Sequence, residues 1–164
     1  MGGGGLVATA DIVPRELAAV FFANGDGFLP SDAADNRIDG REVCYGSAIA
    51  AELVLKAYLL AKGWSDDRCR RDIRHDLEQA LASARAAGLD AASPDLDGVI
   101  GVLNIYYPKH AFDRFVPPAG CKAFPTKART IVASLFDIVR PHIEASGEGA
   151  ERPKPPREPL IRRQ

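Results

Sequence analysis

Apolar residues recur every three or four positions along most of this chain, the spacing that gathers them on one face of an α-helix. The clearest run extends from about Gly40 to Lys62, and Gly63 then suits the left-handed position that ends a helix. Four further helices are predicted from the same spacing and from capping residues: a first from Asp11 to Asn24-Gly25, a third from near His75 to Gly88, a fourth from Ser93, and a fifth from Thr126 that Pro141 kinks in its last turn. Alternation of apolar and polar residues, the strand pattern, is nowhere long enough to predict a sheet.

These helices and their short connections predict an all-α fold, an antiparallel bundle of four to five helices. Residues 11–145 form the single bundle domain in this interpretation. The glycine-rich residues 1–10 are expected to be a flexible N-terminal segment, and residues 146–164, rich in proline and arginine, a flexible tail. The tail is either solvated or a basic arm that touches phosphates or a partner.

The composition is that of an ordinary globular protein of one domain. The chain has 164 residues, of which 46% are hydrophobic and 26% charged, and this excludes disordered and collagen-like classes. The 21 Lys and Arg residues against 22 Asp and Glu residues give a formal net charge of −1. No overall basic character therefore indicates a nucleic-acid partner, although a local basic patch stays open.

The cysteines and the apolar runs bear on the compartment. Cys44, Cys69 and Cys121 contain no Cys-x-x-Cys pair, so neither a disulfide framework nor a zinc ribbon is predicted, and free thiols fit a reducing cytoplasm. The sequence shows neither a secretory signal nor a run of about 18 apolar residues for a membrane span. We expect a cytoplasmic protein without membrane contact, and the frequent Ala, Gly and Arg are typical of a GC-rich bacterial genome.

Motifs of several enzyme classes are missing from the sequence. It contains no Gly-x-Gly-x-x-Gly, no phosphate-binding Gly-x-x-x-x-Gly-Lys-Ser/Thr, no Gly-x-Ser-x-Gly and no His-Glu-x-x-His. The histidines, His75, His110 and His142, lie too far apart for a local two-histidine metal motif. No cofactor and no metal ion are therefore expected.

Three segments in the middle of the chain follow one another in a characteristic order. Residues 47–63 contain Glu-Leu-x-x-Lys-Ala, at 52–57, and end in Gly63; His75-Asp76-Leu77 then opens a helix that ends at Gly88-Leu89; Leu103-Asn104, Tyr106-Tyr107 and Arg114-Phe115 close the series. In this order and spacing, over roughly residues 40–116, the segments resemble the HEPN superfamily of helical domains.

The resemblance implies a four- or five-helix bundle that is commonly a homodimer. Members of the superfamily include metal-independent endoribonucleases, toxins paired with a small nucleotidyltransferase partner, and binding or scaffold domains without catalysis. For this chain it implies a homodimer, RNA or a nucleotide as ligand, and a nucleotidyltransferase-type or antitoxin protein as partner.

One stretch of the sequence offers chemistry. Ribonuclease members of the superfamily use an Arg followed four to six residues later by His, and Arg70 precedes His75 with four residues between them. Metal-independent RNA cleavage needs a proton acceptor for the 2′-hydroxyl or a proton donor for the leaving oxygen, and His performs either role. It also needs positive charge on the developing phosphorane, which an Arg clamp supplies. His75 and Arg70 are thus the candidate catalytic residues.

Other observations favour binding without catalysis. Residues 65–76 contain four Arg and four Asp, whose formal charges cancel. His75 belongs to the His-Asp-Leu motif, which members without the nuclease motif also have, and catalytic members usually carry their Arg and His later in the bundle. That later zone here contains Asn104 and His110 but no Arg.

The leading hypothesis is therefore a non-enzymatic HEPN-like module that binds RNA, a nucleotide or a partner protein. Its candidate phosphate- or nucleotide-binding residues are Arg70, Arg74, His75, Tyr107 and Arg114. The alternatives are a toxin-like, metal-independent endoribonuclease and a purely structural dimerisation domain.

Each candidate side chain also has a structural interpretation. His75 is then a residue at a helix N-terminus whose ring bonds a neighbouring carbonyl or carboxylate, Arg114 pairs with an acid such as Glu52 inside the bundle, and Lys56 is a surface lysine. Cleavage requires His75 and an Arg exposed in one cleft, whereas a structural role predicts that His75 and Arg114 are buried and paired.

Overall fold

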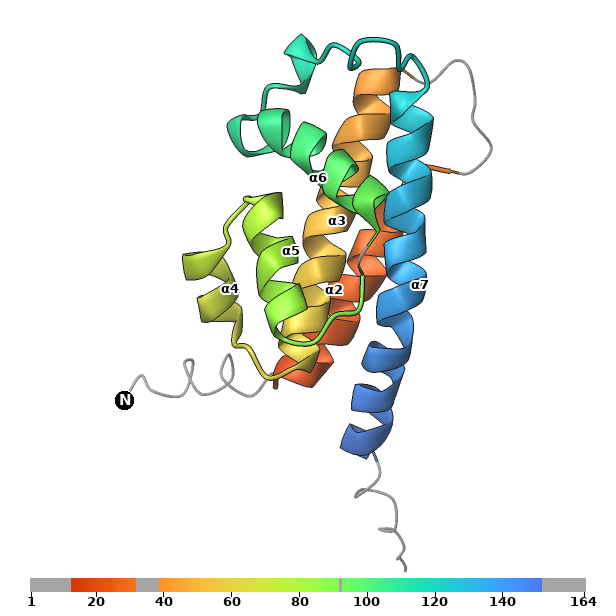
Figure 1. Cartoon of the computed structure of the whole chain (residues 1–164). Helices are drawn as coiled ribbons and strands as arrows, with labels where there is room; N and C mark the ends of the chain where they lie inside the picture. The colour runs from red at the N-terminus through yellow and green to blue at the C-terminus, as the bar shows by residue number, and fades with distance from the viewer. Residues whose placement is uncertain (1–12, 32–38, 92, 152–164) are drawn as a thin grey trace, which may run out of the picture.

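In the part of the chain that the structure describes, every regular element is a helix and there is no strand, which confirms the all-α class (Figure 1). The computed structural model describes residues 13–31, 39–91 and 93–151, with side chains up to Ser146. The helices are α2 (Pro14–Phe28), α3 (Gly40–Ala61), α4 (Asp66–Asp72), α5 (Leu77–Ala86), α6 (Pro94–Tyr106), two short 3₁₀ turns, η1 (Tyr107–Lys109) and η2 (Phe112–Arg114), and α7 (Phe124–Glu151). The predicted cap Asp11 and the N-terminal segment 1–10 lie outside the described residues, as do residues 152–164 of the predicted tail.

Helix α3 is the centre of the bundle, with α2, α5, α6 and α7 packed around it (Figure 1). Its predicted limits are confirmed: the side chain of Asp39 caps its first turn, and Gly63 with φ of +103° follows its end. Among the described helices, α3 is the one long and apolar enough to cross a membrane, and 72% of that stretch is buried within the bundle. A bundle core helix has this composition because neighbours cover it on most sides.

The helices do not simply alternate in direction. Helices α2 and α3 are antiparallel, since the end of α2 lies beside the start of α3 and Phe28 approaches Gly46. Helix α7 runs in the same direction as α3, because Pro125 approaches Gly40 at one end and His142 meets Tyr58 near the other (Figure 1). The antiparallel prediction is therefore correct for α2 against α3 and wrong for α7 against α3.

The prediction for α7 is wrong because the chain contains an additional short helix, α4, and because α6 crosses the bundle at an angle. Helix α4, which the sequence analysis did not predict, carries the chain back after α3, so α5 again runs alongside α3 (Figure 1). Helix α6 then crosses the bundle obliquely, and the connection through η1 and η2 returns the chain to the start of α3 before α7 begins (Figure 1). Helix α4 has only seven residues, too few to show an apolar period, although Ser65 caps it as a sequence signal would require.

Two predicted helix limits need correction. Helix α7 opens at Phe124 rather than at Thr126, and it continues through Pro141 to Glu151. Helix α2 does not end at Asn24-Gly25 but runs to Phe28. Gly25 is buried, and a Cβ placed there would meet Leu53 and Phe136, each at 3.1 Å. The small residue therefore allows α2 to approach α3 and α7 closely, and this packing outweighs the poor helix propensity of glycine.

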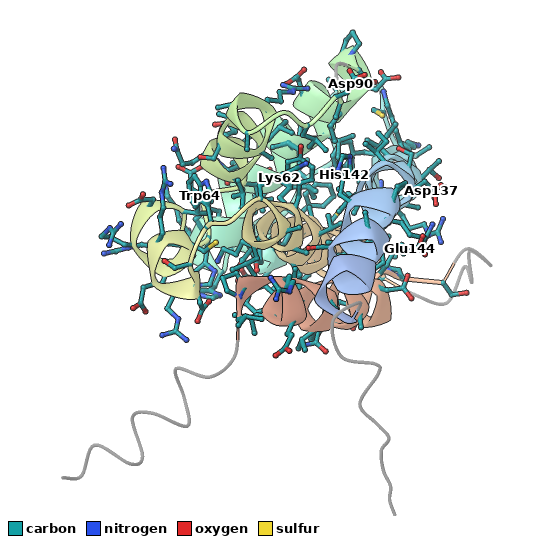
Figure 2. All side chains as sticks on the ribbon, turned by 90° about the horizontal axis from the view of Figure 1, so that it is seen from below. Lys62, Trp64, Asp90, Asp137, His142 and Glu144 are labelled. Atoms are coloured by element: carbon teal, nitrogen blue, oxygen red, sulfur yellow. The ribbon has the colours of Figure 1, made fainter. Side chains whose placement is uncertain are left out.

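At the far end of α3, the side chains of Lys62 and His142 lie close together in the view from below (Figure 2). The His142 ring meets the Tyr58 ring edge-on with centroids 5.0 Å apart, and the Lys62 ammonium lies 5.3 Å from the centre of the same ring. Burial, and secondarily the charge of Lys62, lower the pKa of His142. This end of the bundle is thus closed by packing around a neutral histidine.

The close approach at Gly25 can be tested with two matched variants. We expect Gly25→Leu to destabilise the fold by about 1–3 kcal/mol, because the added side chain overpacks the contact of α2 with α3 and α7. Gly27→Leu places the same side chain on the same helix where an added Cβ meets nothing within 4 Å. It should keep the stability or raise it by up to about 1 kcal/mol through helix propensity. Urea unfolding followed by circular dichroism measures both; equal losses would contradict the close approach.

Candidate functional site

Three segments meet beside the middle of α3 and bring the candidate site together. They are α3 itself, the turn at residues 73–76 between α4 and α5, and the 3₁₀ turn η1 after α6. The side chains that join them are Glu52 and Lys56 of α3, His75 of the turn, and Tyr107 of η1. We refer to these four residues as the Glu52 network.

A buried ion pair forms the base of the Glu52 network. Lys56 Nζ lies 2.8 Å from Glu52 Oε2, and their side chains are only 8% and 10% exposed. The same ammonium donates a hydrogen bond to the backbone carbonyl of Arg74 at 2.7 Å. Lys56 is therefore not the surface lysine of the structural interpretation: it stabilises the turn before α5 from inside the protein.

The other carboxylate oxygen of Glu52 receives two further hydrogen bonds. The Tyr107 hydroxyl lies 2.6 Å from Glu52 Oε1, and His75 Nδ1 lies 2.9 Å from it. Burial on its own would raise the pKa of Glu52, but the hydrogen bonds from His75, Lys56 and Tyr107 outweigh it, so the pKa is lowered. Burial and the bond to Glu52 raise the pKa of Tyr107. Glu52 is thus an ionised carboxylate and Tyr107 a permanent donor to it.

This arrangement fixes which face His75 offers to solvent. An ionised carboxylate only accepts hydrogen bonds, so Nδ1 of His75 carries the proton and, in the neutral ring, Nε2 keeps the lone pair. The side chain is 54% exposed even though Nδ1 is held by a buried group. The His110 ring lies next to it, with the two centroids 6.2 Å apart. A positioned histidine and a second histidine therefore share one patch of surface.

The backbone on both sides of this patch is unusual. In the described part of the chain, the two residues other than glycine with positive φ are Arg74 at +54° and His110 at +52°. Such conformations cost on the order of 1 kcal/mol or more for residues with a side chain, and they concentrate at functional sites. The hydrogen bond from Lys56 to the Arg74 carbonyl holds the first of them in place. The strain thus falls on His110 itself and on Arg74, the residue that precedes His75.

A pocket of about 430 Å³ opens at His75. It is lined by Arg71, Asp72, Ile73, Arg74, His75, Asp76 and Pro108. Both acids in it already have partners: Asp72 accepts from Arg68 and Arg71, and Asp76 caps α5 and accepts from Asn104. The Arg74 guanidinium forms no ion pair with any described residue, so it offers an uncompensated cation beside His75.

The structure gathers some of the predicted site residues and separates others. Arg74 and His75 lie together in the pocket. Arg70 does not line it: its guanidinium lies 2.7 Å from Asp66 and 3.9 Å from Asp67, on its own helix α4. The Arg70 and His75 of the nuclease spacing are thus not brought into one cleft.

The remaining two predicted residues also stand apart from the pocket. Tyr107 is buried and donates its hydroxyl hydrogen bond to Glu52. Its ring packs against the buried side of His75, with the two centroids 5.8 Å apart. Arg114 is exposed, so its expected pairing with Glu52 is wrong: the partners of that carboxylate are Lys56, His75 and Tyr107. Of the five residues predicted to contact a phosphate or nucleotide, Arg74 and His75 therefore remain candidates. Arg71, which lines the same pocket, and His110, which lies beside His75, join them.

Three contributors to the site were missed by the sequence analysis. Glu52 and Lys56 stand four residues apart, a spacing that could have predicted their ion pair, although the same spacing is common on exposed helix faces. No signal near His110 predicted its approach to His75, because η1 brings the two together only in the folded chain.

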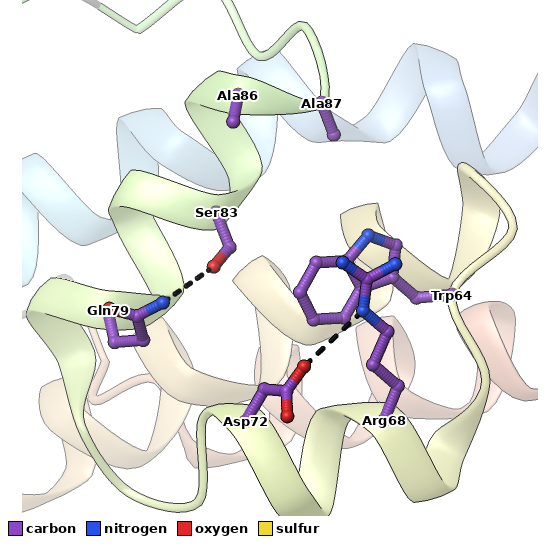
Figure 3. A pocket seen from close by; sticks show the side chains of 7 residues that line it. All are labelled: Trp64, Arg68, Asp72, Gln79, Ser83, Ala86 and Ala87. Carbon is purple, nitrogen blue, oxygen red and sulfur yellow. Dashed lines mark hydrogen bonds and ion pairs between the residues drawn. The ribbon is translucent and has the colours of Figure 1, made fainter.

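A second hollow, of about 500 Å³, lies between α4 and α5 (Figure 3). The Arg68 guanidinium lies over the Trp64 ring, 3.6 Å from its centre, and its Nε is 3.4 Å from Asp72. On the opposite wall, the Gln79 amide donates to the Ser83 hydroxyl (Figure 3). Because these polar groups bond one another, the hollow offers a ligand fewer free partners than the pocket at His75.

Neither family models, nor curated proteins, nor solved structures give a match to this chain. Among the described residues, no group of three side chains that could ligate a metal comes together.

The Glu52 network predicts how the stability of the protein depends on acid. Since the pKa of Glu52 is lowered in the folded state, its contribution is complete above the unfolded value of about 4.3 and is lost as the pH falls through the folded value. Glu52→Gln should lose about 3–5 kcal/mol at neutral pH, because Lys56 remains buried without a charged partner. The free energy of unfolding of Glu52→Gln should then decrease less steeply with falling pH than that of the wild type.

Urea unfolding at a series of pH values from neutral to strongly acid measures this difference. Glu42→Gln, at an exposed position of the same helix, is the matched control and should retain the acid slope of the wild type. An unchanged acid slope in Glu52→Gln would contradict the role assigned to this carboxylate.

Proposed function

We propose that this chain is a HEPN-like helical module that binds RNA or a nucleotide through a phosphate group in the pocket at His75. The observation that carries the proposal is a histidine that buried groups hold from behind while half of its side chain stays exposed. A histidine with only a structural role would be expected inside the bundle. Arg114, for which the structural hypothesis predicted a buried pair, is exposed, whereas His75 does bond a carboxylate as that hypothesis predicted.

The pocket supplies what a phosphate needs. The Arg74 guanidinium is free of ion pairs with described residues, and Arg71 lines the same wall. When its ring is protonated, His75 donates from Nε2, while Nδ1 remains on Glu52. Asp72 is paired with Arg68 and Arg71, whereas Asp76 accepts from neutral donors only, so its charge acts against the binding of an anion. The predicted homodimer and the nucleotidyltransferase-type or antitoxin partner stay predictions.

Binding is testable with a fluorescently labelled, mixed-sequence single-stranded RNA and anisotropy measurements. Arg74→Ala and His75→Ala should each weaken binding about tenfold or more, since a hydrogen bond to a charged group contributes roughly 1.5–3 kcal/mol. Arg70→Ala is the matched control, because that guanidinium is engaged by Asp66 away from the pocket, and it should bind within about twofold of the wild type. The salt dependence of binding should also decrease for Arg74→Ala.

The opposite pattern would contradict the proposal. If Arg70→Ala weakens binding while Arg74→Ala and His75→Ala bind like the wild type, the phosphate is bound elsewhere. Circular dichroism of each variant shows whether the helices are retained.

A second candidate, metal-independent RNA cleavage, is favoured by the pair His75 and His110. His75 Nε2 takes the proton of the 2′-hydroxyl, whose oxygen then attacks the phosphorus. The bond from phosphorus to the 5′-oxygen breaks, and protonated His110 donates a proton to that oxygen. The products are a 2′,3′-cyclic phosphate and a 5′-hydroxyl. Arg74 takes the place that the sequence gave to Arg70, stabilising the charge on the phosphorane.

Cleavage can be measured on the same RNA in EDTA. If the protein is a nuclease, His75→Gln and His110→Gln should each lower the rate by about 10²–10⁴-fold, the usual contribution of a general acid or base. His142→Gln, at the other end of α3, is the control and should cleave normally. DNA of the same sequence, which lacks the 2′-hydroxyl, should remain intact. If the wild type does not cleave the RNA, the cleavage proposal is wrong and the binding proposal is unaffected.

A further inference from the structure

A smaller hollow, of about 340 Å³, lies on the other side of the two histidines. It is lined by Tyr45, His110, Phe112 and Asp113. His110 connects it to the phosphate pocket, because its ring lines this hollow and lies 6.2 Å from the ring of His75, which lines the other. A ligand bound by its phosphate at His75 therefore has this hollow as its nearest neighbour.

The aromatic side chains of the hollow form a platform. Tyr45 is 44% exposed, which is unusual for so large a ring, but one side of the ring packs against other aromatic side chains. Its ring centroid lies 5.9 Å from that of Phe112 and 6.3 Å from that of Tyr107, both buried. An aromatic ring held from behind and open in front is what nucleobases stack on in single-stranded RNA sites.

Asp113 gives the platform a polar edge. The carboxylate is exposed at the rim and forms no hydrogen bond or ion pair with the described residues, so its two oxygens are free to accept. A carboxylate has acceptors only and selects a base whose edge presents donors. Guanine places two neighbouring donors, N1–H and the N2 amino group, along its Watson–Crick edge. The corresponding edges of adenine, cytosine and uracil set an acceptor beside each donor, which a carboxylate repels.

We propose that this hollow is a guanine subsite: the base stacks on Tyr45, and Asp113 accepts from N1–H and N2–H, while the phosphate of the same nucleotide occupies the pocket at His75. The inference rests on the proposed phosphate-binding function and adds the identity of the base. It also assigns a direct ligand contact to Tyr45 and Asp113, which the motifs of the sequence did not single out.

The test is competition of GMP, AMP, CMP and UMP against the labelled RNA, with inorganic phosphate as the probe for the phosphate pocket alone. GMP should compete at least about tenfold better than the other three, the effect of hydrogen bonds to a charged acceptor. Asp113→Asn replaces one acceptor oxygen with a donor, so GMP should lose its advantage over AMP, CMP and UMP, while inorganic phosphate should compete as before. Tyr45→Ala should weaken all four nucleotides about tenfold or more and leave inorganic phosphate unchanged.

Asp90→Asn is the matched control for the charge change, because Asp90 is an exposed acid of the loop after α5, at the other end of α3 (Figure 2). It should retain the GMP preference. Equal competition by all four nucleotides, or a GMP preference that survives Asp113→Asn, overturns the guanine subsite. If Arg74→Ala still weakens all four in that case, the phosphate-binding proposal stands. If Arg74→Ala and His75→Ala change nothing, the phosphate pocket fails, and the subsite fails with it.

Discussion

The carboxylate of Glu52 is the point on which both the fold and the site depend. A buried ion of this kind would cost several kcal/mol if it stood alone, and here it is compensated by Lys56, Tyr107 and His75. Each donor comes from a different part of the chain: one from the same helix, one from η1 and one from the turn before α5. Neither η1 nor the turn before α5 can move away from α3 without leaving a charge or a hydrogen-bond acceptor unpaired in the interior. The segments that carry the exposed histidines are therefore joined to the core helix by buried hydrogen bonds to Glu52 and Lys56.

The parts of the fold that could be predicted from the sequence are those with local causes. The start of α6 at Ser93-Pro94 and the end of α3 before Gly63 follow from capping chemistry that a few neighbouring residues contain. The errors have distant causes. Gly25 continues a helix because α3 and α7 lie against it, and α7 reverses the expected direction because a missed short helix and an oblique one come before it. No window of neighbouring residues contains that information.

In the candidate site, too, the features with local causes could be predicted from the sequence and those with distant causes could not. Arg74 and His75 stand side by side in the sequence, so their partnership could be predicted from it. The approach of His110 could not, because it depends on where η1 lies after α6 has crossed the bundle. The left-handed backbone at Arg74 and His110 was equally hidden, since neither residue is the glycine that usually signals such a conformation. Arg70 was chosen for its distance along the chain, whereas the helix directs it to the acids of its own preceding turn.

The parallel course of α3 and α7 has a consequence for how the chain folds during its synthesis. Helix α2 is the first of the described helices to be made and covers one side of α3 as soon as both have left the ribosome. A neighbouring side of α3 is covered by α7, which also packs against α2 and is the last of the described helices to be made. The long apolar helix α3 thus remains open on one side until α7 has been made, and its exposed surface is of the kind that chaperones bind and that promotes aggregation of nascent chains. A bundle with α7 placed elsewhere would not have this interval.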